Sequence, residues 1–150
     1  MEYRTGRIGR VIIARVDHGE DLLAELTKLA ESERIDQAFF VAIGAIGDAQ
    51  IVTGPKEATI PPDPMWHRVA DAHEVLGVGN ILRKGGEDGK DGEPAIHLHA
   101  ALGRSEGSLV GCLRDSVETY LTVEIVILEV TGVLAERAYD DALGVARMMF

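Results

Sequence analysis

The chain has 150 residues, of which 25 are acidic and 15 are basic, so its formal charge at pH 7 is −10. This length predicts a single domain over residues 1–150, with a core large enough to need no disulfide. The negative charge repels nucleic acid and anionic membranes, and therefore disfavours a general binder of phosphate backbones.

The cysteine count and the hydropathy pattern point to one cellular setting. A single cysteine cannot form an intramolecular disulfide. The N-terminus does not resemble a signal peptide, and no apolar run approaches the ~20 residues that span a bilayer. We therefore expect a cytoplasmic protein with no membrane partner.

The N-terminal segment predicts a strand and then a helix. Residues 7–16 are rich in β-branched side chains and carry Arg7, Arg10 and Arg15. These arginines suit an edge strand kept soluble by charge, and the alternative is a contact with an anion or with nucleic acid. In residues 20–31 the leucines form one stripe, which predicts an amphipathic helix packed on a sheet.

The next residues predict two strands separated by glycines. Residues 37–43 and 48–53 are strand-like, and Gly44 and Gly47 between them allow a tight reversal with close backbone approach. Residues 54–65 contain four prolines and predict an excursion loop.

A further strand is predicted over residues 69–82, and its start is polar. His73 is a candidate fourth metal ligand or general base there, with a solvated strand end as the alternative. Residues 84–92 alternate glycine with charged residues and predict an exposed hairpin loop.

Two histidines on a predicted strand, residues 96–102, form the strongest candidate site. Residues i and i+2 share a strand face, so His97 and His99 point the same way. If this strand pairs as a hairpin with the apolar run 108–111, Cys112 falls beside it. Imidazole nitrogen and thiolate sulfur are ligands that zinc accepts, which predicts a metal site at these three residues. Histidines that only form hydrogen bonds and a buried structural cysteine are the alternative.

The C-terminal part predicts a short polar link at residues 114–118, a long apolar strand at 119–130 and a last edge strand within 134–150. Glu124 lies among apolar residues of the long strand. Because an unpaired buried carboxylate is costly, we expect a partner for it, and it is a second candidate for a base or for a group that supports a metal ligand. The whole pattern predicts an α+β domain, with a mostly antiparallel sheet of about seven strands and one main helix packed on it.

Several short motifs, in this order along nearly the whole chain, resemble the plant and prokaryote conserved (PPC) domain. They are Gly19-Glu20-Asp21-Leu22-Leu23, Ile43-Gly44-Ala45-Ile46, Glu74-Val75-Leu76-Gly77 with Gly79-Asn80-Ile81, His97-Leu98-His99, Val110-Gly111-Cys112-Leu113 and Thr122-Val123-Glu124. The resemblance implies a seven-stranded antiparallel sheet with a helix, assembled as a homotrimer. It also implies a prokaryotic single-domain member, of the kind commonly labelled DNA-binding without an established activity.

The chain departs from the family pattern at two points. Residues 6–10, Gly-Arg-Ile-Gly-Arg, lack the proline of the AT-hook that accompanies this domain in plants, so minor-groove binding does not carry over. Cys112 stands where the family has a third histidine, and this exchange keeps a metal-binding donor.

Three functions are compatible with the sequence. The first is a regulatory or scaffolding homotrimer whose DNA binding, if any, is weak, dependent on salt and confined to the arginines of residues 7–16. The second is a zinc-dependent enzyme, a small hydrolase or lyase, with zinc on His97, His99 and Cys112 and with His73 or Glu124 as base. The third is a module that senses a metal or ligand without turnover.

Overall fold

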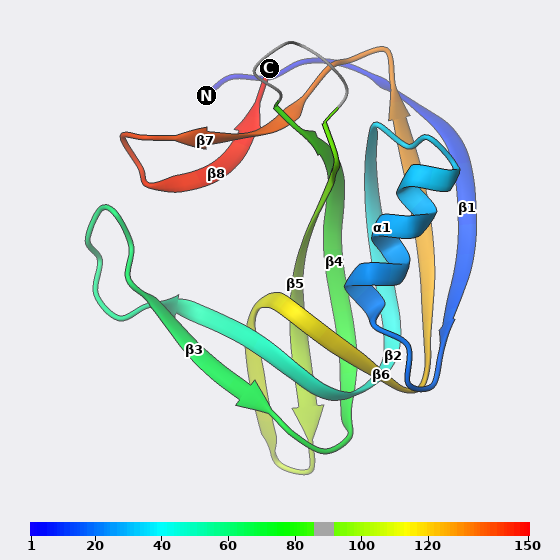
Figure 1. Ribbon diagram of the computed structural model, residues 1–150, viewed down its shortest axis with the longest axis vertical. Helices are drawn as coiled ribbons and strands as arrows, with labels where there is room; N and C mark the ends of the chain where they lie inside the picture. The colour runs from blue at the N-terminus through cyan, green and yellow to red at the C-terminus, as the bar shows by residue number, and fades with distance from the viewer. Residues whose placement is uncertain (86–91) are drawn as a thin grey trace.

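The computed structural model describes residues 1–85 and 92–150, in which one helix packs against a large β-sheet (Figure 1). Of the predicted loop at 84–92, residues 86–91 lie outside the described residues. The elements are β1 (Arg7–Asp17), α1 (Leu22–Ser32), β2 (Gln37–Pro55), β3 (Pro64–Val69), β4 (His73–Lys84), β5 (Pro94–Arg104), β6 (Gly107–Thr131), β7 (Glu136–Asp140) and β8 (Val145–Met149). The α+β class is confirmed, with eight strands where about seven were predicted.

The strands pair in the order β3-β2-β6-β5-β4-β7-β8, while β1 pairs with β6 and β2 also pairs with β4. All described pairings are antiparallel except that of β4 with β7, which is parallel and involves two residue pairs. Because β2 contacts both β4 and β6, and β5 joins those two strands on the other side, these four strands form a ring of pairings.

The structure corrects the predicted reversal between residues 43 and 48. Residues 37–55 form one strand, β2, whose register against β6 shifts at three places between Gly44 and Gln50. At Gly44 the φ angle is 143°, and a Cβ atom would lie 2.2 Å from the carbonyl oxygen of Thr122. Glycine therefore allows a close approach that bends β2 without reversing it. Residues 114–118, predicted as a link, likewise lie inside the continuous strand β6.

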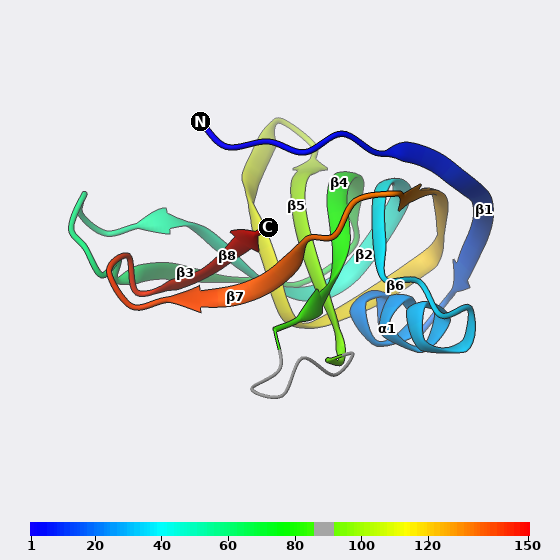
Figure 2. The same ribbon diagram turned by 90° about the horizontal axis from the view of Figure 1, so that it is seen from above.

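The helix covers one face of the sheet. Of the predicted leucine stripe, Leu22 and Leu26 are buried, and Leu23 and Leu29 are partly buried against the core. Asp21 caps the helix, since its side chain accepts a hydrogen bond of 2.8 Å from the amide of Ala24. Figure 2 shows α1 on one side of β2, β4, β5 and β6. The core lies between this helix and the strands.

The opposite face of these strands, continued by β1, is apolar and exposed, and we call it the bare face. Its large apolar side chains are Val11, Ile13, Phe39, Val41, Ile43, Leu76, Val78 and Val126. Cross-strand pairing aligns one row across it, from Ile13 through Val126, Val41 and Val78 to His99. The histidine strand therefore forms the border of the bare face.

The C-terminal residues form a hairpin, β7–β8, where one edge strand was predicted. The hairpin reaches the proline-rich loop between β2 and β3, because a Cβ atom at Gly144 would lie 2.4 Å from Cβ of Pro61. Within the described residues, no helix is both long enough and apolar enough to cross a membrane.

Candidate metal site

The pairing of β5 with β6 brings the three predicted ligands together. Alternation along β5 buries Leu98 in the core and directs His97 and His99 to the other face. The hairpin turn between β5 and β6 then places Cys112 directly opposite His99. Spacing along one strand and register between two strands are thus enough to bring the three side chains together.

The donor atoms of these residues are close to one another. The Nε2 atoms of His97 and His99 lie 3.2 Å apart, and both lie with Sγ of Cys112 in a group whose members are all within 4.8 Å. A tetrahedral ion ~2.0 to 2.1 Å from two nitrogens separates them by ~3.3 Å. The two imidazoles therefore already have the spacing of ligands to one ion, and the thiol is their nearest soft neighbour.

Burial affects the protonation of two members of the cluster, His97 and Cys112. Burial first, and then the nearby charges of Arg137, His99 and Arg114, together lower the pKa of His97 to about 4. His97 is therefore neutral at pH 7, with a nitrogen lone pair free to bind a cation. Burial also raises the pKa of the Cys112 thiol, so a metal that binds here displaces the thiol proton.

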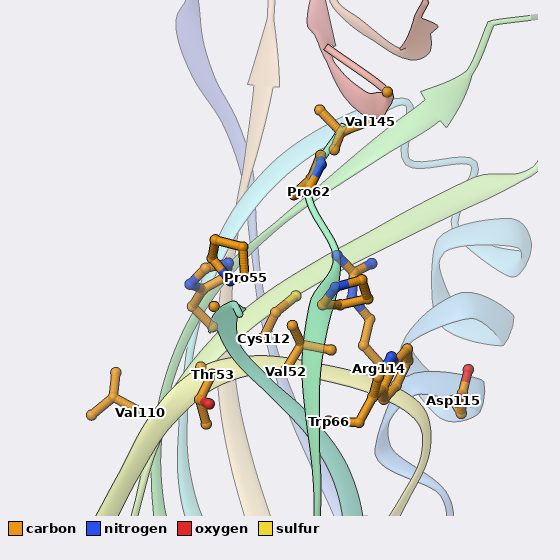
Figure 3. A pocket seen from close by; sticks show the side chains of 15 residues that line it. Val52, Thr53, Pro55, Pro62, Trp66, Val110, Cys112, Arg114, Asp115 and Val145 are labelled. Carbon is orange, nitrogen blue, oxygen red and sulfur yellow. The ribbon is translucent and has the colours of Figure 1, made fainter. Parts of the chain in front are cut away.

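Two cavities meet at this cluster. The first, of about 770 Å³, is lined by His99, Cys112 and Trp66, and we call it the tryptophan cavity. The second, of about 590 Å³, is lined by His97, Lys84 and Arg137, and we call it the cationic cavity. Arg114 and Val145 line both cavities. Figure 3 shows Cys112, Trp66 and Arg114 around the tryptophan cavity, with Val145 of the hairpin at its other end.

The structure does not bring His73 to the cluster. His73 lies at the start of β4, five residues before Val78, which pairs with His99, and five residues of strand span ~17 Å. Its Nδ1 atom lies 2.9 Å from the carbonyl oxygen of Asp71. Asp71 itself precedes the strand, in a turn with a φ angle of 68°. His73 is thus placed as a strand-end residue, away from the three donors.

Glu124 is also outside the cluster. It lies opposite Arg15 and Ile43 on the bare face, where it is exposed. The expectation of a buried carboxylate was wrong because the apolar face around Glu124 is uncovered in the single chain. Among the described residues it has no ion-pair partner, and its exposure removes the need for one.

Two of the three arginines of β1, Arg10 and Arg15, are paired with carboxylates. Arg10 donates hydrogen bonds to Glu129 and Glu33, each at 2.9 Å, and Arg15 contacts Asp17 at 2.7 Å. These carboxylates neutralise most of the charge that a phosphate backbone would need.

The sequence analysis overlooked the arginines of the site. Arg114 follows Cys112 at i+2 and so shares its strand face, a signal of the same kind as His97 and His99. Arg137 comes from β7, and no local pattern connects it to β5. Its guanidinium donates a hydrogen bond of 2.7 Å to the side-chain oxygen of Asn80, whose register partner is His97.

The sequence matches the family model of the Plants and Prokaryotes Conserved (PCC) domain over residues 3–131. The chain belongs to this family. The prediction from the motifs is thereby confirmed, since the PPC and PCC abbreviations denote the same conserved domain. The β7–β8 hairpin, which contributes Arg137 to the surroundings of the site, lies beyond the residues that the PCC model matches. Among curated proteins, none matches the sequence significantly.

Solved structures share the fold over nine tenths or more of this PCC chain. A metal-containing protein from Archaeoglobus fulgidus has 24% identity and a TM-score of 0.85, with 100% of both chains covered. A plant- and prokaryote-conserved protein from Pyrococcus horikoshii has 26% identity and a TM-score of 0.80, covering 100% of this chain and 99% of the other. A protein from Ralstonia eutropha, provisionally described as DNA-binding, has 21% identity and a TM-score of 0.75, with 92% and 90% covered.

Proposed function

We propose that this PCC-domain chain binds a divalent metal ion, zinc by preference, through His97, His99 and Cys112. One observation carries the proposal: two imidazole nitrogens lie 3.2 Å apart on one strand face, with a thiol opposite. Nitrogen and sulfur donors suit zinc, and burial keeps His97 neutral and able to bind it. The description of the Archaeoglobus fulgidus relative as metal-containing supports the same function.

The metal site belongs, in this proposal, to a regulatory or scaffolding protein that forms a homotrimer. The bare face supports self-association, because a large apolar surface on a soluble protein marks a contact site. Three-fold assembly follows from the family resemblance, and a trimer would bury the row from Ile13 to Val78. Residues 1–150 would act as one domain in each subunit, since one sheet includes strands from both ends of the chain.

DNA binding is the weakest part of the proposed role. Relatives from Ralstonia eutropha and Bacteroides thetaiotaomicron are provisionally described as DNA-binding, which supports it. The charge of −10 and the ion pairs of Arg10 and Arg15 oppose it. We expect at most weak binding that is lost as salt rises.

A zinc-dependent enzyme, a small hydrolase or lyase, is the second candidate. The tryptophan cavity favours it, because this cavity is large enough for a small molecule and opens at His99 and Cys112. Bound zinc would supply a Lewis acid there. A sensing module would use the same cavity without turnover, so a screen of hydrolase and lyase substrates separates the two.

The test is elemental analysis of protein purified without a histidine tag. We expect about one ion per chain in the native protein and none in the double variant His97→Ala, His99→Ala. The matched control is His18→Ala, His67→Ala, which removes two histidines elsewhere and should keep the ion. Cys112→Ser should weaken the binding, because a hydroxyl replaces the soft donor.

Each variant is checked for folding by circular dichroism, so that loss of metal is not confused with loss of structure. Native protein that takes up no zinc under reducing conditions contradicts the proposal. Full zinc affinity in Cys112→Ser would remove the cysteine from the ligand set.

A further inference from the structure

Two arginines beside the proposed metal ligands have no countercharge. Among the described residues, no carboxylate oxygen lies within 4.0 Å of Arg114 or Arg137. Arg10, Arg68 and Arg104, by contrast, each contact an acidic side chain. Arg7 and Arg34 likewise have no such partner in the described part of the chain, but only Arg114 and Arg137 of these four line a cavity described above.

The two guanidiniums are also close to each other. The pKa of Arg137 is lowered by burial and then by the charge of Arg114. Arg114 and Arg137 both line the cationic cavity together with Lys84, and none of the residues that line this cavity is acidic. Like charges held together in a partly buried place are costly unless an anion joins them.

The neighbouring tryptophan cavity offers a different surface. Its walls are mostly apolar and include Val52, Val110 and the ring of Trp66, which is 48% exposed. An exposed aromatic ring beside prolines and valines suits a flat or branched apolar group. Arg114 lines both cavities, so its guanidinium can reach a ligand in either of them.

We propose that Arg114 and Arg137 hold the oxyanion group of a small organic anion whose apolar body lies against Trp66. The anion is a carboxylate or a phosphate monoester, since both match the forked guanidinium donors. The inference extends the proposed function, because it names the ligand class of the cavities that open at His97, His99 and Cys112. Val145 of the β7–β8 hairpin lines both cavities, so the hairpin contributes to the wall of this ligand site as well as supplying Arg137.

Trp66 is the single tryptophan of the chain, so its fluorescence reports on this cavity. The full chain is titrated with benzoate, with phenyl phosphate and with benzyl alcohol, which has the ring and lacks the charge. We expect saturable changes with one or both anions, and the tighter of the two identifies the oxyanion. Benzyl alcohol should bind about tenfold more weakly or worse, since it forms no charge-assisted hydrogen bond.

The variants Arg114→Gln and Arg137→Gln should each weaken binding of the anion by about tenfold or more. The matched control is Arg104→Gln, an exposed arginine on β5 that pairs with Asp71 and lines neither cavity. It should bind the anion as the native protein does. Equal binding of benzyl alcohol, unchanged binding in Arg114→Gln, or no saturable change in the native protein would each overturn the proposal.

Metal content is measured on the same samples, before and after treatment with a chelator. Native protein that holds zinc but binds neither anion refutes the anion site and leaves the metal function in place. Anion binding that needs Arg114, in protein that takes up no zinc, supports the anion site and refutes the metal function.

Discussion

The two faces of the sheet are built from the same strands and have opposite surroundings. Phe40 points to the helix-covered face and is fully buried. Phe39, the residue before it in β2, points to the bare face and is 46% exposed. The covered face is closed by α1 in the single chain. The bare face is equally apolar in its centre and ends at His97, His99 and Cys112.

One strand pattern thus places the residues that stabilise the fold on one face and the residues of the proposed metal site on the other. Burial against α1 stabilises the single chain, because it removes apolar area from water. The side chains of the bare face contribute little to the stability of the single chain, because they stay in contact with water unless a partner covers them. Every residue of the proposed metal site projects from the face that the fold of one chain does not use.

The largest expected effect comes from a pair of neighbouring substitutions. Phe40→Ala should reduce the free energy of unfolding by ~3 to 5 kcal/mol, because it leaves a cavity in the core. Phe39→Ala should cost much less in the single chain, and its cost should grow with protein concentration because it acts through association. Urea denaturation at several protein concentrations measures both. If the two substitutions reduced the free energy of unfolding equally at every protein concentration, the two faces would not differ in how they contribute to stability.

A charge on the bare face should break self-association. Val41 lies in the middle of the apolar row and is 39% exposed, so the proposed trimer would bury it. Val41→Asp should dissociate the trimer, since an unpaired carboxylate is costly in a dry interface. Sedimentation velocity gives the mass of the species. Leu134→Asp, between β6 and β7, is the control and should leave the mass unchanged; a trimer in both variants would place the interface elsewhere.

The smallest effect concerns an ion pair at the edge of the covered face. Hydrogen bonds from Arg10 lower the pKa of Glu129 below its ordinary value of 4.5. The pair therefore stabilises the fold above pH ~4.5, and the contribution is lost as the pH falls through the lowered pKa. Glu129→Gln should be slightly less stable than the native protein at pH 7, and this difference should shrink on acidification and in high salt. Urea denaturation at pH 7 and pH 3 measures it, and a difference that widens in acid would contradict the assignment.

The sequence predicted the parts that depend on local patterns. The helix of residues 20–31 and the shared face of His97 and His99 follow from periodicity, and the position of Cys112 follows from a short hairpin. The joining of residues 37–55 into one strand was not predictable, because the bend at Gly44 depends on the distant backbone of Thr122. Whether a strand continues through a bend is decided by contacts with segments that are distant in the sequence.

The same limit applies to the surroundings of the site. Arg137 reaches His97 only through the β7–β8 hairpin, which no spacing rule connects to β5. Glu124 was misjudged because an apolar strand pattern does not say whether a face is covered. In the proposed trimer, other chains would cover the bare face, and the sequence of one chain contains no periodic signal for that.

The cross-strand pair of His99 and Cys112 also has an evolutionary consequence. Both side chains leave the backbone on the side away from the core, and Leu98 and Leu113 keep the core side of the same two strands filled. A mutation that exchanges one donor for another at position 112 would therefore change the proposed ligand set from the side of the strands opposite to Leu98 and Leu113. Such a scaffold can drift between histidine and cysteine donors, and so between metals, at little cost in foldability.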